Sequence, residues 1–164
     1  MIALDRKISE YFLSQDNLWG MRLFQAVSHL GAGVLWLCVY ALGLIFFQND
    51  AHRLVLTLVI AELMGLVVII PLRYCIRRNR PSANYKCSRI TPWNRYSFPS
   101  HHAFRAFSIA IIVGVRHPGA FPYLICAALA IGFSRIYLSK HYLTDVLAGT
   151  LLAVGVASAS LRMV

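Results

Sequence analysis

His141 and Asp145 are the two residues whose types and spacing most directly suggest chemistry. They stand four residues apart at the start of an apolar stretch, so in a helix both side chains lie on one face. There a carboxylate can accept the Nδ1 proton of the imidazole and leave Nε2 as a free nucleophile. Arg135, just upstream, is a permanent cation with a planar fork of donors, the residue type that binds phosphate. Together they predict a nucleophile, its orienting carboxylate and an oxyanion ligand.

Two further patterns lie upstream. Residues 73–81 read R-x6-RP, and residues 99–102 read PS-x-H. Pro99 suits the first turn of a helix, where a missing N–H costs nothing. The free N–H groups of that turn, with the hydroxyl of Ser100, then form an anion site at the helix N-terminus. Both patterns therefore add phosphate-binding groups to those near His141.

With SR-x5-H-x3-D at residues 134–145, these patterns resemble the motifs KxxxxxxRP, PSGH and SRxxxxxHxxxD of the type-2 phosphatidic acid phosphatase superfamily. The third motif matches at every fixed position. Arg73 replaces the lysine of the first motif, and His101 replaces the glycine that gives close backbone approach to phosphate. An outward turn of His101 would let it bind a second headgroup anion. The resemblance implies an integral-membrane lipid phosphatase built as a six-helix bundle.

The resemblance and the residue chemistry together predict a two-step phosphoryl transfer. His141 attacks phosphorus to give a phosphohistidine, while Asp145 holds the tautomer. His102 protonates the departing oxygen and then activates the water that hydrolyses the intermediate. The helix N-terminus and five side chains bind the phosphoryl oxygens: Arg73, Arg80, Ser100, His101 and Arg135. No metal or cofactor is expected, because arginines supply the positive charge.

Other polar residues lie near the motifs or inside the apolar stretches. Arg105, one helical turn after the second motif, is expected to contact substrate, and Glu62 to be a neutral or hydrogen-bonded packing residue inside an apolar stretch. Cys75 and Cys87 flank the first motif and would pair only in an oxidising compartment. A basic loop around the first motif contains Arg77, Arg78, Lys86, Arg89 and Arg95. Its positive charge could serve either attraction to anionic lipid headgroups or simple solubility, and the sequence leaves both open. Arg77, Arg78 and Arg105 are the candidate headgroup contacts.

The composition is that of a membrane protein. Of 164 residues, 59% are hydrophobic and 13% are charged, whereas soluble domains carry roughly 25% charged residues. Five runs are each long enough to cross a bilayer when the motif residues are included: 31–47, 54–72, 99–115, 119–138 and 141–161. The motifs then lie in terminal turns at the membrane–water boundary, where polar groups stay hydrated. We expect one all-α membrane domain over residues 1–164, with its helical core at 31–164.

Residues 1–30 differ from this core. Leu4, Ile8 and Phe12 recur at helical spacing, which predicts an interfacial amphipathic helix. Its polar face carries Asp5, Lys7 and Glu10. Because the resemblance implies six helices and five spans are evident, residues 18–30 are expected to form a short sixth helix. The sequence leaves open whether that helix spans the membrane or lies flat on it.

Alternating span directions place all three motifs on one membrane face. Of 16 Lys and Arg residues, only Arg53, Arg116 and Arg162 fall on the other face if the N-terminal segment lies with the motifs. The positive-inside rule would then place the motifs in the cytoplasm, whereas the resemblance implies an extracytoplasmic site in the inner membrane. We favour the extracytoplasmic face, because many of these cations have phosphate to bind.

The sequence thus predicts a phosphatase that acts on lipid phosphates in the bilayer. Candidate substrates are a polyprenyl pyrophosphate, phosphatidylglycerophosphate and the 1-phosphate of lipid A; the physiological lipid and the oligomeric state remain open. A vanadium-dependent haloperoxidase shares the anion-site motifs, but its members are soluble and larger. A basic membrane scaffold explains the composition and not the motifs. Nucleic-acid binding would suit the net charge of +10, yet the cations cluster at lipid level on one face.

Overall fold

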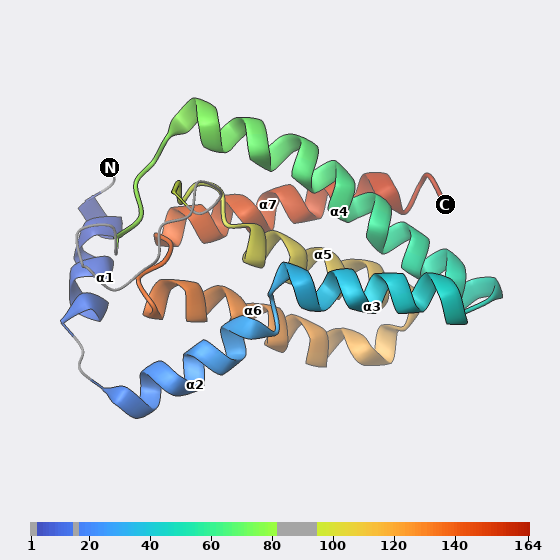
Figure 1. Cartoon of the computed structure of the whole chain (residues 1–164), viewed down its shortest axis with the longest axis horizontal. Helices are drawn as coiled ribbons and strands as arrows, with labels where there is room; N and C mark the ends of the chain where they lie inside the picture. The colour runs from blue at the N-terminus through green and yellow to red at the C-terminus, as the bar shows by residue number, and fades with distance from the viewer. Residues whose placement is uncertain (1–2, 15–16, 82–94) are drawn as a thin grey trace.

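The structure is a computed structural model that describes residues 3–14, 17–81 and 95–164 (Figure 1). Within these ranges the regular structure is helical, and the only β-type pairing is an isolated bridge between Asn79 and Tyr96. The α-helices are α1 (Ala3–Leu13), α2 (Leu18–His29), α3 (Gly33–Phe46), α4 (Asn49–Ile76), α5 (His101–Arg116), α6 (Phe121–Tyr137) and α7 (Leu143–Ser160). The all-α prediction is confirmed.

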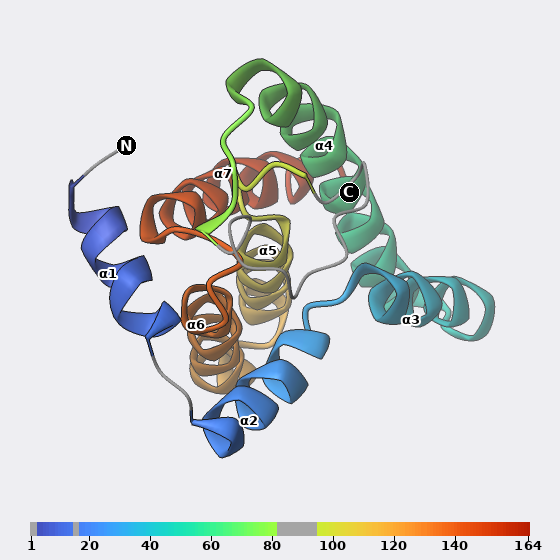
Figure 2. The same cartoon turned by 60° about the vertical axis from the view of Figure 1, so that its left-hand side comes forward.

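Helix α5 forms the centre of the bundle. It packs against α4, α6 and α7, which surround it when the molecule is viewed toward one end (Figure 2). Its sixteen residues span about 24 Å at 1.5 Å per residue. Because neighbouring helices cover α5, it needs little apolar surface toward lipid and can carry polar residues in its first two turns.

Four described segments are long and apolar enough to cross a membrane: Leu18–Phe46, Asn49–Ile76, Pro118–Tyr137 and Leu143–Ser160. The first contains both α2 and α3, which follow one another along the long axis of the molecule (Figure 1). The break between them falls at residues 30–32, where Ala32 has extended backbone angles. Residues 18–30 therefore belong to the first part of a candidate span that also contains α3. With the shorter helix α5 among them, the described residues provide five candidate spans, one fewer than the resemblance implied.

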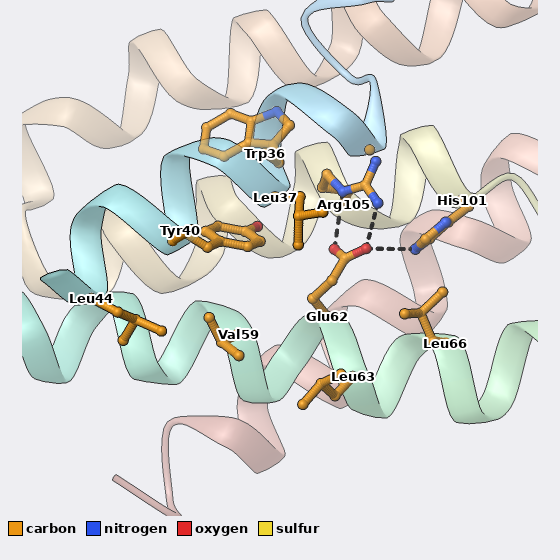
Figure 3. A pocket seen from close by; sticks show the side chains of 12 residues that line it. Trp36, Leu37, Tyr40, Leu44, Val59, Glu62, Leu63, Leu66, His101 and Arg105 are labelled. Atoms are coloured by element: carbon orange, nitrogen blue, oxygen red, sulfur yellow. Dashed lines mark hydrogen bonds and ion pairs between the residues drawn. The ribbon is translucent and has the colours of Figure 1, made fainter.

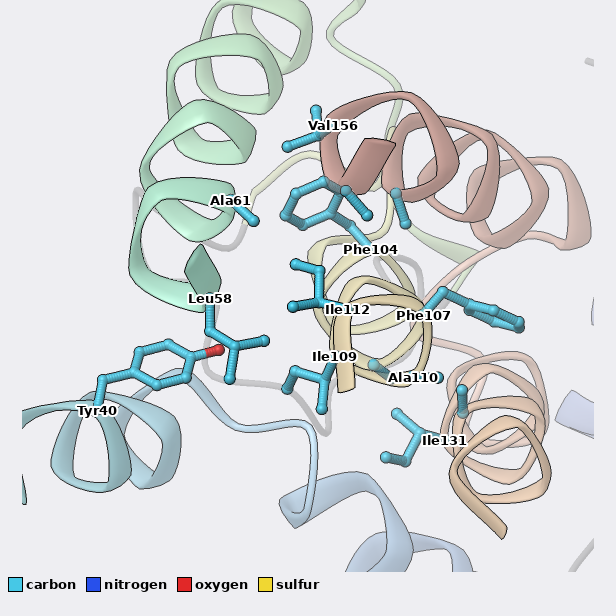
Figure 4. Close-up of a cluster of buried hydrophobic side chains, with 14 of the residues drawn as sticks. Tyr40, Leu58, Ala61, Phe104, Phe107, Ile109, Ala110, Ile112, Ile131 and Val156 are labelled. Atoms are coloured by element: carbon cyan, nitrogen blue, oxygen red, sulfur yellow. The ribbon is translucent and has the colours of Figure 1, made fainter. Parts of the chain in front are cut away.

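The buried core is centred on apolar side chains of α5 (Figure 4). Phe104 and Ile112 are fully buried, and they pack among residues of α4, α6 and α7. Close packing requires glycine at several positions, two of which lie near the start of α5. A Cβ on Gly65 would lie 2.2 Å from the Phe104 ring, and one on Gly149 would lie 2.4 Å from the carbonyl oxygen of Ser100. The second contact brings α7 against the turn that begins α5.

Helix α1 confirms the helix predicted near the N-terminus, but its environment differs from a purely interfacial one. Ile8 and Phe12 pack against a small buried cluster formed by residues of α5, α6 and α7. Asp5, expected on the polar face, is only 1% exposed. The chain thus docks α1 against the bundle at the same end as the three motifs (Figure 1).

Candidate active site

His141 lies in the short connection between α6 and α7 and is 1% exposed. Its Nδ1 is 2.7 Å from the backbone carbonyl oxygen of Ser97. Because a carbonyl oxygen only accepts hydrogen bonds, Nδ1 carries the proton and Nε2 is left unprotonated. Nε2 lies 3.4 Å from Nη1 of Arg80. The tautomer is the one that a phosphorus-attacking histidine requires.

Asp145 does not hold His141 in the way the sequence suggested. One carboxylate oxygen is 3.7 Å from Nδ1 of His141, too far for a hydrogen bond. That oxygen accepts the backbone N–H of Tyr142 at 2.9 Å, and the other accepts Nη1 of Arg78 at 2.7 Å. The predicted acceptor is therefore corrected: Ser97 fixes the tautomer, whereas Asp145 caps α7 and acts on the imidazole through its charge.

The surroundings of His141 keep the imidazole neutral. Burial, followed by the positive charges of Arg80, Arg135 and Arg73, lowers the pKa of His141 well below its ordinary value. A protonated imidazole would be a poor nucleophile, and burial among cations disfavours protonation. The same cations are placed to attract a phosphate group.

Three arginines are gathered around His141, and each is braced by other groups. Arg73, in the last turn of α4, donates from Nη2 to the carbonyl oxygen of Pro99 at 3.2 Å. Arg80 donates to the carbonyl oxygens of Lys140 (3.1 Å) and Tyr96 (3.3 Å). Burial, with the charge of Arg73, lowers the pKa of Arg80 to about 10, so it stays protonated at neutral pH. Arg135, near the end of α6, is hydrogen-bonded to the hydroxyl of Ser28 in α2.

Several donors at this end of the bundle have no acceptor among the residues that the structure describes. They are Nε of Arg73, Nε of Arg135 and the hydroxyl of Ser100, all buried. Buried donors normally have partners, and unpaired ones carry a free-energy cost. A bound phosphoryl group has oxygens that would accept all three, which fits their predicted role.

His102 lies in the first turn of α5 and is half-buried. It forms no hydrogen bond with any described residue. Gly31, in the connection between α2 and α3, approaches it closely, because a Cβ there would lie 3.0 Å from Cδ2 of His102. The imidazole is therefore partly covered by the connection between α2 and α3.

The side chains of His101 and Arg105 point toward Glu62 of α4 (Figure 3). Nε2 of His101 is 2.9 Å from Oε1 of Glu62, and Nε of Arg105 donates to Oε2 at 3.0 Å. Arg105 also donates to the carbonyl oxygen of Gly31 at 2.8 Å. The side chains of His101 and Arg105 thus pair with Glu62, because a carboxylate within a span must be paired. Phosphate binding by His101 and substrate contact by Arg105 stay predictions. Glu62 is the hydrogen-bonded packing residue that was expected.

An apolar cavity of about 370 Å³ lies between α3 and α4, beside this charged cluster (Figure 3). Its polar end consists of Glu62, His101 and Arg105. The remainder is mainly apolar and includes Trp36, Leu37, Tyr40, Leu44, Val59 and Leu63. Since His101 is the immediate neighbour of Ser100 and His102, the cavity begins beside the second motif.

The first motif's other arginines have separate structural roles. Arg77 ends α4 in a left-handed conformation (φ 50°), with Nε donating to the carbonyl oxygen of Tyr74. Arg78 is bound by Asp5 and Asp145 and lies 4.0 Å from the ring centre of Tyr142. Its predicted headgroup contact is corrected, since both terminal nitrogens already serve carboxylates. Lys86, Cys87 and Arg89 lie outside the described residues.

Three residues that contact the predicted site residues were not predicted from the sequence: Ser97, Ser28 and Asp5. Ser97 acts through its backbone carbonyl, so its side-chain type gives no signal. Ser28 reaches Arg135 from a helix that is remote in sequence. Asp5 looked like one more charge on the polar face of an amphipathic helix. The signal available in the sequence was the alternation of apolar and charged residues around Asp5, which indicates that one face of this helix packs against other helices.

The geometry therefore combines a neutral histidine, whose Nε2 is unprotonated, with guanidinium groups and buried donors at a helix N-terminus. The model of the PAP2 superfamily matches residues 51–164, which include all three motifs. The chain belongs to the PAP2 superfamily. This confirms the resemblance, and together with the apolar helices it makes the chain a multi-pass membrane protein.

Related PAP2 proteins match nearly the whole chain. Phosphatidylglycerophosphatase B of Bacillus subtilis (strain 168) is 26% identical over 163 residues, covering 90% of this chain and 76% of the relative. Undecaprenyl-diphosphatase of Sulfolobus acidocaldarius is 29% identical over 150 residues, covering 90% of this chain and 71% of the relative. The crystal structure of a transmembrane PAP2 type phosphatidylglycerolphosphate phosphatase from Bacillus subtilis superposes with a TM-score of 0.79 at 22% identity. That match covers 97% of this chain and 83% of the other, and shows a common fold.

Proposed function

We propose that this PAP2 protein is a membrane lipid phosphatase that removes a terminal phosphoryl group through a phosphohistidine on His141. The observation that carries the proposal is the tautomer of His141. Its Nδ1–H is held by Ser97, and its Nε2 is directed toward Arg80. A base in that state, among cations that bind phosphate, suits nucleophilic attack on phosphorus.

The first step forms the bond between Nε2 and phosphorus and breaks the bond between phosphorus and the lipid oxygen. The electron pair passes to that oxygen, which takes a proton from His102. In the second step, water attacks phosphorus and gives a proton to His102, and the nitrogen–phosphorus bond breaks to release phosphate. Asp145 and the Ser97 carbonyl stabilise the positive charge that His141 acquires between the two steps.

Arg73, Arg80, Arg135 and Ser100 bind the three equatorial oxygens, where transition-state charge develops. These cations do what a divalent ion does in many other phosphoryl-transfer enzymes. We therefore propose that the reaction needs no metal ion. The donors that lack partners in the described chain support this assignment.

The cavity between α3 and α4 supports a lipid substrate, because an apolar lining suits a hydrocarbon chain whose phosphate lies near Ser100. The names of the two relatives support phosphatidylglycerophosphate or a polyprenyl pyrophosphate, and the 1-phosphate of lipid A remains a third candidate. We place the site on the extracytoplasmic face of the inner membrane, since phosphate binding accounts for many of its cations.

Phosphate release from these three lipids, measured with purified protein in lipid nanodiscs with and without excess EDTA, tests this function. The proposal expects turnover of at least one lipid, no loss in EDTA, and none with His141→Ala. No release from any of the three would contradict the lipid phosphatase. Loss in EDTA that Mg²⁺ restores would contradict only the metal-free chemistry.

A further inference from the structure

A buried charge cluster links α1 to the first turn of α7. Nη2 of Arg78 donates to Oδ2 of Asp5 at 2.6 Å, and Nη1 donates to Oδ1 of Asp145 at 2.7 Å. Asp5 is 1% exposed and Asp145 is fully buried. One guanidinium therefore bridges two buried carboxylates, one of which lies next to His141.

Asp5 also binds α7 directly. Its Oδ1 accepts the backbone N–H of Thr144 at 3.1 Å, and its Oδ2 accepts the Thr144 hydroxyl at 2.5 Å. The first N–H groups of a helix have no partner within the helix, and an anion is stabilised there. Asp5 thus satisfies the turn of α7 that immediately follows His141 and Tyr142.

The carboxylate of Asp5 is ionised in this environment. Burial opposes ionisation, but the hydrogen bonds from Thr144 and Arg78 outweigh it and lower the pKa of Asp5. Removing one partner of a buried charge pair leaves the other charge uncompensated. Loss of Asp5 would therefore leave Arg78 with Asp145 alone and release the first turn of α7.

We infer that Asp5 is a positioning residue for phosphoryl transfer, acting through Arg78 and Thr144 on Asp145 and His141. It holds the carboxylate of Asp145 at its 3.7 Å separation from Nδ1 of His141. This keeps the imidazole in register with Ser97 and Arg80. The inference rests on the proposed function, and Asp5 lies outside the residues that the family model matches.

The kinetic test compares Asp5→Asn, Arg78→Gln and the double variant on the lipid that the wild type hydrolyses. Asp5→Asn preserves the size of the side chain and should lower kcat about tenfold with KM within about twofold. The double variant should be no slower than Arg78→Gln, because coupled residues are not additive. Glu10 is an exposed acid of the same helix, and its ion-pair partner among the described residues is the exposed Arg6. Glu10→Gln is therefore the matched control and should behave like the wild type.

A second readout does not depend on turnover. In ¹⁵N-histidine NMR spectra, the His141 signals (assigned by their loss in His141→Ala) should shift in Asp5→Asn and stay fixed in Glu10→Gln. If Asp5→Asn does not fold, the same two measurements on Asp5→Glu, which keeps the charge but moves it, should show smaller changes in the same direction. Unmoved His141 signals, a kcat within twofold of wild type, or a loss that adds fully to that of Arg78→Gln would each overturn the inference. An inactive wild type would instead count against the proposed function, and the NMR result would still decide the role of Asp5.

Discussion

At the scale of single residues, the chemistry depends on which group holds Nδ1 of His141. The structure assigns that role to the backbone carbonyl of Ser97 at 2.7 Å, with the carboxylate of Asp145 at 3.7 Å. A backbone acceptor cannot be removed by changing a side chain. The tautomer should therefore survive changes at Asp145, whereas stabilisation of the imidazolium should not.

Asp145→Asn should consequently cost less than the loss of the orienting carboxylate in a serine-protease triad, which is about 10⁴-fold in kcat. We expect a loss of about tenfold to a hundredfold, because the charge disappears while the Ser97 bond remains. Steady-state kinetics in nanodiscs measure this directly. A loss of 10⁴-fold or more would show that Asp145, and not Ser97, fixes the tautomer.

His102 should matter in proportion to the basicity of the leaving group. An alkoxide needs a proton in the transition state and a nitrophenolate hardly needs one, so His102→Ala should slow phosphorylation by an alkyl phosphate about 10²- to 10⁴-fold more than by p-nitrophenyl phosphate. With the aryl ester a burst of nitrophenol should precede slow turnover, because the same imidazole activates water. Equal losses on both substrates without a burst would show that His102 binds phosphate and does not transfer the proton.

The neutral state of His141 also makes stability depend on pH. Its folded-state pKa is lowered, first by burial and then by Arg80 and the other arginines. Below pH 6.5, roughly the ordinary pKa of histidine, the unfolded chain therefore binds a proton at this residue and the folded chain does not, so acid favours unfolding. Between pH 7 and pH 5 the melting temperature of the wild type should therefore fall further than that of His141→Gln. His117→Gln, at an exposed histidine, controls for the loss of a histidine elsewhere. Equal falls for wild type and His141→Gln would mean that His141 is protonated in the folded protein.

At the scale of elements, charge and apolar patterning predicted most of the helices that position the site. Residues 54–72, 119–138 and 141–161 fall on α4, α6 and α7, because an uninterrupted apolar run has few alternatives in a bilayer. The joint direction of α2 and α3 was not predictable, since it depends on packing of α2 against α6 and of α3 against α4. The pairings of Glu62 with His101 and Arg105 were likewise invisible, because they join residues of two different helices.

The cavity between α3 and α4 can be tested as the binding site of the lipid tail. Ala41→Trp fills the cavity that Ala41 lines, and should lower kcat/KM for a long-chain lipid phosphate by at least about tenfold through lost tail binding. p-Nitrophenyl phosphate has no tail and should react as before. Val154→Trp, at a half-exposed position of α7, is the matched control. Equal effects of Ala41→Trp on both substrates would show that the hydrocarbon chain of the lipid does not bind in this cavity.

At the scale of the whole molecule, alternating crossings bring three sequence-distant motifs to one end of the bundle (Figure 1). The sequence predicted this convergence, since an odd or even number of crossings fixes the side on which each motif falls. It did not predict that α1 closes the same end, with Asp5 bound to Arg78 and Thr144. That contact depends on a single buried carboxylate, which patterning assigned to the polar face.

The covalent intermediate is the most direct test of the central claim that His141 is the nucleophile. Wild-type protein in nanodiscs would be mixed with a ³²P-labelled lipid phosphate, quenched within milliseconds, and mapped by digestion and mass spectrometry. The account predicts an acid-labile, base-stable label on His141 that forms and decays at rates consistent with kcat. In His141→Ala both the label and turnover should be absent. Substantial turnover by His141→Ala, or a label on another residue, would contradict it.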